Sequence, residues 1–283
     1  MLPVALTVAG SDSGGGAGIQ ADLKTFHQFG VYGTSAIVAV TAQNTRGVQA
    51  VHPVPAAVVE AQLAALAEDL PPHALKSGML ATAELVGLLA AAITRYSWSG
   101  YVLDPVMVAT SGDRLLSGDA EALVRSRLVP LADVVTPNLH EAGILAGFPV
   151  TGPETMARAG RALLDLGARA ALVKGGHLPG DEVVDLLVSP DGLREIRHPR
   201  IATRSTHGTG CTLSAAITAG LARWRASGFG SGESGMDASP PKPDLHRIVA
   251  DAVDFVQRAI AAAPGLGSGA GPLSHLVTVR GEQ

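Results

Sequence analysis

The sequence predicts a single α/β domain in which helices cover both faces of a central, mostly parallel sheet. The first observation is that short apolar runs rich in Val, Leu and Ala alternate with helical patterns almost throughout. Such alternation is typical of strand–helix–strand units, which build parallel sheets. The second is that 283 residues suffice for one large domain with a sizeable core. The third is that Ala and Gly are abundant and aromatic residues few, which favours close packing of helices against a sheet.

The expected elements follow one another in a regular order. Strands are expected at residues 4–9, 35–42, 48–54, 74–77, 101–103, 134–136, 170–174, 183–188 and 193–198. Helices are expected at residues 17–29, 55–70, 83–96, 118–128, 139–146, 153–166 and 213–221. In sheets of this kind ligands bind beyond the carboxyl ends of the strands. Functional residues are therefore expected just after the strands.

Composition and charge exclude several classes of function. The formal net charge is −4 and Lys and Arg form no run, so neither nucleic acid nor an anionic membrane is expected as a partner. A single cysteine excludes an intramolecular disulfide framework and a cysteine-cluster zinc site. The apolar run at residues 85–93 is too short to cross a bilayer. Because the chain begins directly in a strand-like run, without a signal-peptide pattern, we expect a cytoplasmic protein.

Polar turns follow the first two expected strands. The glycine-rich loop at residues 10–18 precedes a helix that carries Asp22. It has neither a Walker lysine nor the G-x-G-x-x-G spacing, so it matches no common nucleotide-binding loop. Gln43 lies at the end of the second strand and offers both a hydrogen-bond donor and an acceptor, which suits the edge of a heterocycle. An ordinary polar turn residue is the alternative for Gln43.

Three further strand ends in the middle of the chain carry candidate ligands. Met79 follows a glycine turn, where it could line a pocket or fill the core. Asp104 closes the strand at residues 101–103 and could hold Mg²⁺ through water or cap a turn. Asn138 and Glu141 share one face of the next helix at i and i+3. This pair could organise a hydrated magnesium ion, but it is also an ordinary helix cap.

Two motifs late in the chain suit phosphate. Lys174 and Gly175 close a strand, where the ammonium could meet phosphate and the glycine would let a nucleotide approach the backbone. Residues 206–212 form a glycine-rich turn that opens a helix, and such turns bind anions through free N–H groups and the helix dipole. Cys211 falls in the first turn, where that field would stabilise a thiolate. A small buried hydrophobe is the alternative for a lone cysteine.

Three segments are expected to be flexible within a domain that spans residues 1–283. Residues 226–243 are rich in Gly, Ser and Pro and predict a flexible insert between two helices. A literal G-x-G-x-x-G at residues 230–235 lies inside this insert, without strand or helix, and is a chance match. Residues 264–283 predict a C-terminal tail that drapes over a ligand or is disordered. The polar residues 109–114 predict a flap over the site.

Taken together, seven motifs resemble the hydroxymethylpyrimidine/phosphomethylpyrimidine kinases of the ribokinase-like superfamily. Each motif alone is weak, but all seven occur in the family's order and cover nearly the whole chain. The motifs are AGSDSGGGAGIQADLKTF from Ala9, AQNTRGV from Ala42, KSGML from Lys76, LDPVM from Leu103, TPNLHEA from Thr136, VKGGH from Val173 and THGTGCTLSAA from Thr206.

The resemblance implies transfer of the γ-phosphoryl group of ATP, with Mg²⁺, to 4-amino-5-hydroxymethyl-2-methylpyrimidine and then to its monophosphate, in thiamine biosynthesis. It implies a pyrimidine pocket formed by Gly10, Asp22, Gln43, Met79 and Val106. It implies a magnesium and phosphate region formed by Asp104, Asn138 and Glu141. It implies a nucleotide side with Lys174, Gly175 and Thr206, and an anion hole with Gly208, Thr209 and Gly210. It also implies a homodimer without a separate lid domain.

Cys211 places the sequence within the superfamily. Sugar and adenosine kinases of this superfamily carry Asp at the corresponding position as a general base, whereas the pyrimidine kinases carry Cys. The resemblance therefore implies that Cys211, if ionised, accepts the proton of the hydroxymethyl group. For the monophosphate the acceptor is already an anion, so Lys174 and the N–H groups of the anion hole are expected to dominate.

Two other functions remain open at this point. The first is a pyridoxal or pyridoxine kinase, or an enzyme that accepts both ring systems, because some relatives with this cysteine phosphorylate pyridoxal. The second is a pyrimidine-binding regulator without catalysis, against which the presence of Asp104, Glu141 and Lys174 speaks. A dehydrogenase lacks support, because no dinucleotide fingerprint stands between a strand and a helix.

Overall fold

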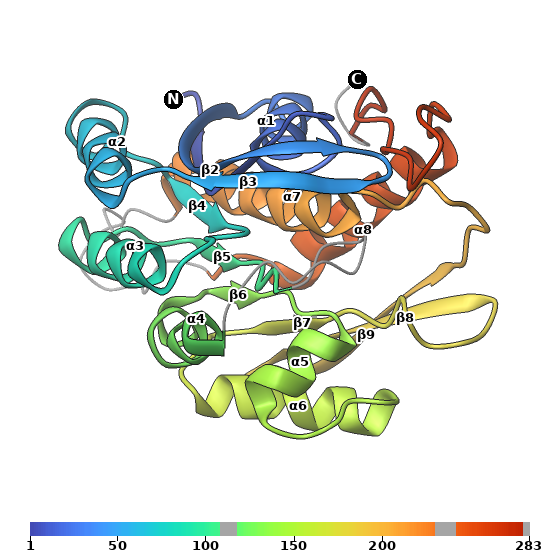
Figure 1. Ribbon diagram of the computed structural model, residues 1–283. Coiled ribbons are helices and arrows are strands. Elements are labelled where there is room, and N and C mark those ends of the chain that lie inside the picture. Colours follow the sequence, from blue (N-terminus) through green and yellow to red (C-terminus); the bar gives the residue numbers. More distant parts are fainter. Residues whose placement is uncertain (108–117, 230–241, 280–283) are drawn as a thin grey trace.

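The computed structural model of the chain describes residues 1–107, 118–229 and 242–279 (Figure 1). In chain order the strands are β1 Val4–Asp12, β2 Tyr32–Asn44, β3 Gly47–Pro53, β4 Ala74–Ser77, β5 Tyr101–Leu103, β6 Val134–Val135, β7 Ala171–Val173, β8 Glu182–Ser189 and β9 Gly192–Pro199. The helices are α1 Gly18–Gln28, α2 Ala56–Asp69, α3 Ala83–Arg95, α4 Gly118–Leu123, α5 Leu139–Ala146, α6 Pro153–Asp165, α7 Thr209–Trp224 and α8 Leu245–Ala261. The expected flap at residues 109–114 and the chance match at residues 230–235 lie outside the described residues.

All the described strands belong to one sheet with the order β3-β2-β1-β4-β5-β6-β7-β8-β9. Strands β2, β1, β4, β5, β6 and β7 run parallel to their neighbours in this series. Strand β3 adds to one edge and the hairpin β8–β9 to the other, both antiparallel. The expected fold class, a mostly parallel sheet without a separate lid domain, is confirmed.

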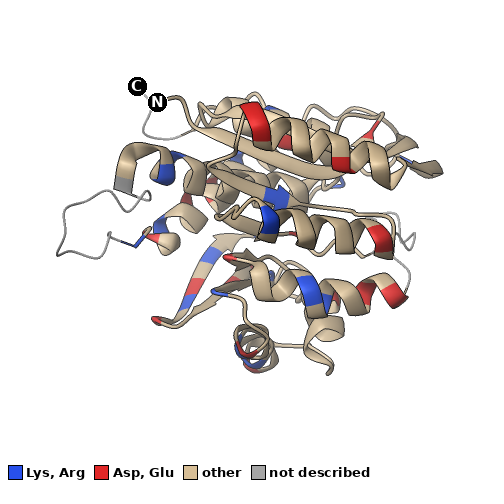
Figure 2. Cartoon of the chain, turned by 90° about the vertical axis from the view of Figure 1, so that its left-hand side faces the viewer, with Lys and Arg blue, Asp and Glu red and all other residues tan. Residues whose placement is uncertain are grey.

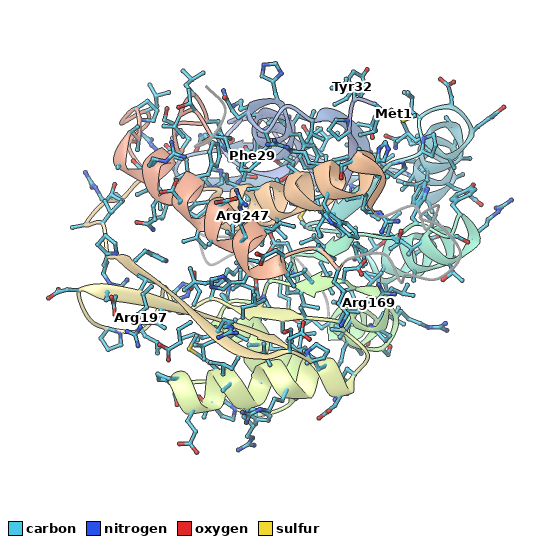
Figure 3. The ribbon with its side chains drawn as sticks, turned by 180° about the vertical axis from the view of Figure 1, so that it is seen from behind. Met1, Phe29, Tyr32, Arg169, Arg197 and Arg247 are labelled. Atoms are coloured by element: carbon cyan, nitrogen blue, oxygen red, sulfur yellow. The ribbon has the colours of Figure 1, made fainter. Side chains whose placement is uncertain are left out.

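Helices cover both faces of this sheet. On one face the largest core cluster joins β1, β2, β4 and β5 to α2, α3, α4 and α6. On the other face a second cluster joins the sheet to α1, α7 and α8. Figure 3 shows this second face, with α7 and α8 lying across it and Phe29 beside them. The rings of Phe29 and Phe255 pack edge to face there, with their centroids 5.1 Å apart. This contact packs the end of α1 against α8.

Local sequence sets the ends of several helices. The side chain of Thr82 caps α3 by accepting the N–H of Leu85. The carboxylate of Asp244 caps α8 in the same way. Pro153 occupies the first turn of α6, where a missing N–H costs nothing. Gly147, in a left-handed conformation, ends α5. These caps explain why the boundaries of α3, α5 and α6 agree closely with those expected from the sequence, whereas no bounds were expected for α8.

Four elements differ by three residues or more at one end at least. Strand β1 runs to Asp12 instead of ending at residue 9. Strand β2 extends beyond residues 35–42, because Tyr32 pairs with Val4 of β1 and Asn44 pairs with Gly47 of β3. The residues at both ends of this strand are polar or include glycine, so the pattern of apolar residues could not predict where the strand begins and ends. The helix expected at residues 118–128 ends at Leu123 and continues as a π-helical turn, Val124–Leu128. The helix expected from residue 213 begins four residues earlier, at the start of α7.

The charged residues show no separation by sign. In Figure 2, Lys and Arg are interspersed with Asp and Glu along the helices and the hairpin. This distribution agrees with the small net charge of −4. Within the described ranges, no helix combines the length and the apolar character that crossing a bilayer requires.

Candidate active site

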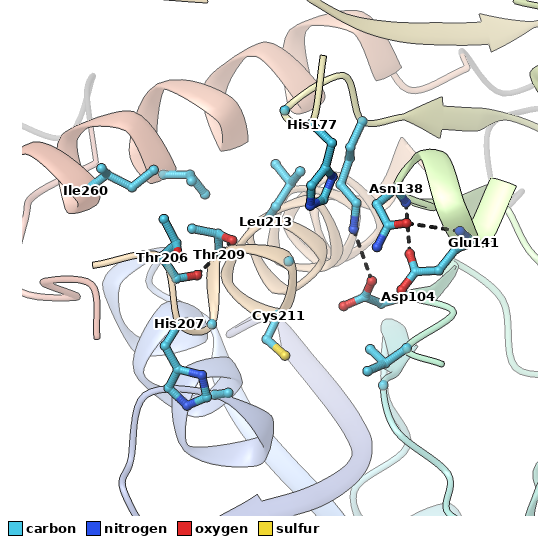
Figure 4. A pocket seen from close by; sticks show the side chains of 18 of the residues that line it. Asp104, Asn138, Glu141, His177, Thr206, His207, Thr209, Cys211, Leu213 and Ile260 are labelled. Carbon is cyan, nitrogen blue, oxygen red and sulfur yellow. Dashed lines mark hydrogen bonds and ion pairs between the residues drawn. The ribbon is translucent and has the colours of Figure 1, made fainter. Parts of the chain in front are cut away.

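A cleft of about 1010 Å³ opens at the carboxyl ends of the parallel strands. The loops after β1, β2, β4, β5, β6 and β7 form its walls, together with the hairpin β8–β9, the start of α7 and one side of α8. Most residues named from the sequence line it: Gly10, Gln43, Met79, Asp104, Val106, Asn138, Glu141, Lys174, Thr206, Gly208, Thr209, Gly210 and Cys211. Figure 4 shows Asp104, Asn138 and Glu141 on one side of this cleft, opposite Thr206 and His207.

One end of the cleft is formed by the turns after β1, β2 and β4. Gln43 follows an irregularity in the pairing of β2 with β3, and its Oε1 accepts a hydrogen bond of 3.2 Å from Thr41. The methyl group of Met79 occupies the space that a side chain at Gly10 would need. With Val106, these residues give one polar edge among apolar surfaces. Such an end suits a flat heterocycle with polar atoms on its rim.

Asp12 and His207 join the two glycine-rich turns, a contact that the sequence analysis missed. His207 Nε2 lies 2.9 Å from Asp12 Oδ2, and the same carboxylate accepts the N–H groups of Gly14, Gly16 and Ala17. Burial on its own would raise the pKa of Asp12, but the hydrogen bonds from His207 and the backbone lower it below its usual value. Asp12 lies in the family motif that starts at Ala9, and His207 lies in the motif that starts at Thr206. Their positions in these motifs could have indicated a role in the site.

Gly208 lets the two turns approach each other closely. Its φ of +86° is left-handed, and a Cβ at this position would collide with the carbonyl oxygen of Gly16. Gly208 is also the N-cap of α7, and Gly210 and Cys211 in the first turn of this helix line the cleft, while the N–H of Thr209 donates to the carbonyl oxygen of Thr206. The glycine-rich turn therefore does open a helix, and anion binding by it stays a prediction. No other residue type fits at this position.

The structure does not place Asp22 on the wall of the cleft. Its side chain is completely buried and forms an ion pair of 2.8 Å with Lys76, which is equally buried. Its second oxygen accepts a hydrogen bond from Thr7. Burial on its own would lower the pKa of Lys76, but the Asp22 carboxylate holds it above its usual value, whereas burial raises the pKa of Asp22 against the opposing effect of Lys76. Asp22 is therefore not among the residues that line the cleft, contrary to the expectation.

Lys174 and Asp104 meet at the centre of the cleft. Lys174 Nζ lies 3.4 Å from Asp104 Oδ1, and Ser214 of α7 donates to Asp104 Oδ2. Burial on its own would lower the pKa of Lys174, but the carboxylates of Asp104 and Glu141 raise it, so the ammonium keeps its charge. A permanent cation therefore lies beside the N-terminus of α7, in a position suited to phosphate oxygens.

Gly175 does not line the cleft, although it was expected on the nucleotide side. Its N–H donates a hydrogen bond of 2.7 Å to Asp185 of β8. A Cβ there would collide with the carbonyl oxygen of Val184. Gly175 therefore allows β8 to pack closely behind Lys174, and the adjacent Gly176 lines the cleft instead.

Asn138 and Glu141 form the helix cap that the sequence left as an alternative. Asn138 Oδ1 accepts the N–H of Glu141, while Glu141 Oε2 accepts the N–H of Asn138. Both side chains also line the cleft. Burial raises the pKa of Glu141 to about 7, with a further contribution from Asp104. Capping and a role in the site are therefore compatible, because the carboxylate keeps further lone pairs free.

Cys211 lies in the first turn of α7, partly exposed to the cleft. Burial raises the pKa of its thiol to about 12, against the opposing effects of the Lys76 ammonium and a hydrogen bond from the N–H of Gly18. Burial therefore acts against the expected easing of ionisation at the helix N-terminus. The nearby carboxylates of Asp22 and Asp104 act in the same direction as burial.

The far end of the cleft is apolar, a part of the site that sequence reasoning missed. Its wall comes from the hairpin β8–β9, the following segment and the helices α7 and α8. The apolar lining residues are Val183, Ile201, Leu213, Val253, Val256 and Ile260. His198 and Gln257 add polar atoms to this wall. The sequence shows a regular apolar spacing along α8. This spacing predicts packing against the core equally well as contact with a ligand, so it could not identify this part of the site.

Comparisons with known proteins agree over most of the chain. The family model described as phosphomethylpyrimidine kinase matches residues 12–227. A hydroxymethylpyrimidine/phosphomethylpyrimidine kinase from Rhizobium meliloti strain 1021 is 49% identical over 278 residues, which cover 97% of each chain. The thiamine biosynthesis bifunctional protein ThiED from Geobacter sulfurreducens is 44% identical over 272 residues, which cover 96% of this chain and 52% of that longer protein.

A solved structure shares the fold as well. The ADP complex of Bacillus subtilis pyridoxal kinase matches with a TM-score of 0.84 and 35% identity, covering 97% of this chain and 98% of that one. Sequence and fold comparisons therefore both extend over nearly the whole chain.

Replacing Lys76 by Met is expected to destabilise the protein by about 3–5 kcal/mol, because it leaves the buried Asp22 carboxylate without its partner. Urea denaturation, followed by circular dichroism, measures the free energy of unfolding. The control is Arg95→Met, which removes an exposed ion pair with Glu60 and should cost no more than about 1 kcal/mol. An equally small decrease in the free energy of unfolding in both variants would contradict the importance of the buried pair.

Alkylation of Cys211 by iodoacetamide is expected to be slow at pH 8 and to rise about tenfold per pH unit up to pH 9, because only the thiolate reacts. A thiol with a raised pKa gains thiolate in proportion to hydroxide throughout this range. Cys211 is the single cysteine, so mass spectrometry reports it alone. The control is the same chain in urea, whose rate should level off near the ordinary cysteine pKa of about 8.5. A folded-state plateau below pH 8 would refute the raised pKa.

Proposed function

The chain belongs to the phosphomethylpyrimidine kinase family, and we propose that it transfers the γ-phosphoryl group of ATP to 4-amino-5-hydroxymethyl-2-methylpyrimidine and then to the resulting monophosphate. Several relatives at 38–49% identity carry the name of this kinase. The observation that carries the proposal is that Gln43, Lys174 and Cys211 all line one cleft. These residues come from distant parts of the chain, and only the fold brings them together.

The acceptor ring is proposed to bind at the end formed by Gly10, Gln43, Met79 and Val106. The apolar surfaces of Met79 and Val106 fit the faces of the ring. The Gln43 amide can both donate to and accept from the ring nitrogens and the amino group. Thr41 donates a hydrogen bond to its Oε1, which orients the amide and leaves its nitrogen free to donate to the ring. The hydroxymethyl group then points toward Cys211.

The phosphates of ATP are proposed to lie across Lys174 and the N-terminus of α7. Gly208 and Gly210 contribute backbone N–H groups there, and Thr206 borders the same turn. In the transfer, an oxygen of the acceptor forms a bond to the γ-phosphorus while the bond to the β,γ-bridging oxygen breaks and ADP leaves. With the alcohol as acceptor, the hydroxyl proton passes to a phosphate oxygen and from there to water. Such transfers depend mainly on positioning and on charge stabilisation. Lys174 and the N–H groups supply both without moving.

Mg²⁺ is proposed to be held through water by Asp104 and Glu141, with Asn138 beside them. Their donor atoms are carboxylate and amide oxygens, which this ion prefers. Within the described part of the chain, no three His, Cys, Asp or Glu side chains form a cage for a metal. The set therefore fits an ion that keeps most of its water rather than a fully protein-bound one. When bound, the ion would offset the charge of the phosphate oxygens.

We extend the proposal to a homodimer acting in the cytoplasm. Strand β3 is an edge of the sheet, and Val51 on it and Val40 on neighbouring β2 are exposed. An edge strand with exposed valines is a surface that a second copy could cover.

Mass spectrometry of the products tests the reaction. With Mg-ATP and the pyrimidine alcohol, the monophosphate is expected first and the diphosphate later, with one ADP released for each step. The control is Lys174→Met, which should lose most of the activity because it removes the only lysine lining the cleft in the described residues. A far higher kcat/KM for pyridoxal than for the pyrimidine would instead favour a pyridoxal kinase. Pyrimidine binding without any transfer would favour a regulator.

Cys211→Ala is expected to lower kcat/KM for the alcohol and for the monophosphate by similar factors, within about threefold of each other. The reason is that a thiol with a pKa of about 12 keeps its proton at pH 7, so it shapes the anion site rather than acting as a base. Steady-state kinetics on each acceptor separately makes the measurement, with Cys211→Ser as the conservative variant. A loss confined to the alcohol would restore Cys211 as the general base.

A further inference from the structure

Two buried polar atoms at the apolar end of the cleft lack a hydrogen-bond partner. Across residues 1–107, 118–229 and 242–279, the unpaired buried side-chain atoms are His198 Nδ1 and Gln257 Oε1. Both residues line the cleft, among apolar neighbours such as Leu213 and Ile260. Buried polar atoms in proteins are almost always paired, so an unpaired one calls for an explanation. A ligand that donates hydrogen bonds at this end would supply it.

His198 presents an acceptor in one of its two neutral tautomers. Its Nε2 lies 3.5 Å from Asp185 Oδ2, and Asp185 in turn accepts the N–H of Gly175. In the tautomer whose Nε2–H faces this carboxylate, Nδ1 carries a lone pair and no hydrogen. In that tautomer Nδ1 can only accept a hydrogen bond, so its pairing requires a donor on the ligand.

Gln257 differs from His198 in this respect. It lies on α8, between Val253 and Ile260, on the side of the helix that lines the cleft. Rotation of its amide by a half turn exchanges the acceptor Oε1 for the donor Nε2. Gln257 can therefore pair with a donor or with an acceptor on the same ligand. Gln257 therefore strengthens binding of a ligand, but it does not select between a ligand that donates and one that accepts a hydrogen bond.

The ligand for this end follows from the proposed function, on which this inference rests. With the phosphates at Lys174 and the N-terminus of α7, the base of the nucleotide reaches the apolar wall. Adenine carries an amino group at position 6, which donates, whereas hypoxanthine carries an oxygen there, which accepts. We propose that His198 selects a 6-aminopurine nucleotide over a 6-oxopurine nucleotide, while Gln257 strengthens the binding of either. An oxygen at position 6 would set two lone pairs against each other at Nδ1.

Binding of ATP and of inosine triphosphate tests this selection without any acceptor. The two nucleotides differ at the edge of the base that carries position 6, so isothermal titration of the full chain compares that edge directly. The wild-type protein is expected to bind ATP about tenfold or more tightly than inosine triphosphate. In His198→Phe, which keeps a flat ring, the ratio should fall to about one through weaker ATP binding. Gln257→Met should weaken both nucleotides alike and preserve the ratio.

His246→Phe is the matched control, because His246 is exposed at the start of the same helix as Gln257. It should change neither affinity, and thermal unfolding checks that each variant is folded. Equal binding of the two nucleotides by the wild-type protein would overturn the inference without any variant. A ratio that survives in His198→Phe, or that is lost in Gln257→Met, would also overturn it. Selective ATP binding without transfer to the pyrimidine would overturn the proposed function and leave this inference standing.

Discussion

The hydrogen bond between Asp12 and His207 holds the site together. It joins residues 195 positions apart in the chain, Asp12 at the end of β1 and His207 in the turn before α7. In the proposed function, the glycine-rich turn after Asp12 borders the acceptor and the turn before α7 borders the phosphates. Because Gly208 rests against the carbonyl oxygen of Gly16, the two turns cannot separate without losing this contact. The distance between the two substrates is therefore set by the protein before either one binds, which is what positioning requires.

Opposed charges beneath and beside the cleft provide a second constraint. The carboxylates of Asp22, Asp104 and Glu141 are buried there beside the ammonium groups of Lys76, which is buried, and Lys174, which is partly exposed. Each lysine keeps its proton because carboxylates surround it, whereas burial raises the pKa of Asp22 and Glu141 against the opposing effect of the lysines. Lys174 alone of the two lines the cleft, so the positive charge offered to a ligand is localised at one point. A phosphate arriving there finds a cation that needs no proton transfer to be charged.

The sequence predicted the positions of the functional turns better than the burial and protonation of the side chains in them. Apolar runs ending in Asp104, Lys174 or Asn138 marked strand ends, and the topology of a parallel sheet brings strand ends to one edge. Burial is different, because it depends on how separate elements pack. Nothing near Asp22 in the sequence indicates that Lys76 is its partner, and nothing near Cys211 indicates that burial raises the pKa of its thiol. The apolar wall formed by α8 could not be predicted for the same reason, because residues that pack in a core and residues that contact a ligand have the same spacing along a helix.

The protonated state of Cys211 bears on why one site can serve two different acceptors. Kinases of the same superfamily that act on sugars carry a carboxylate at this position. That group suits an alcohol, which must lose a proton, but it would repel an acceptor that is already a phosphate anion. A thiol with a pKa of about 12 brings no negative charge at neutral pH. At the N-terminus of α7 it leaves the field of the helix and of Lys174 free to attract the second acceptor. A neutral residue at this position therefore weakens proton removal in the first step and removes a repulsion that would oppose the second.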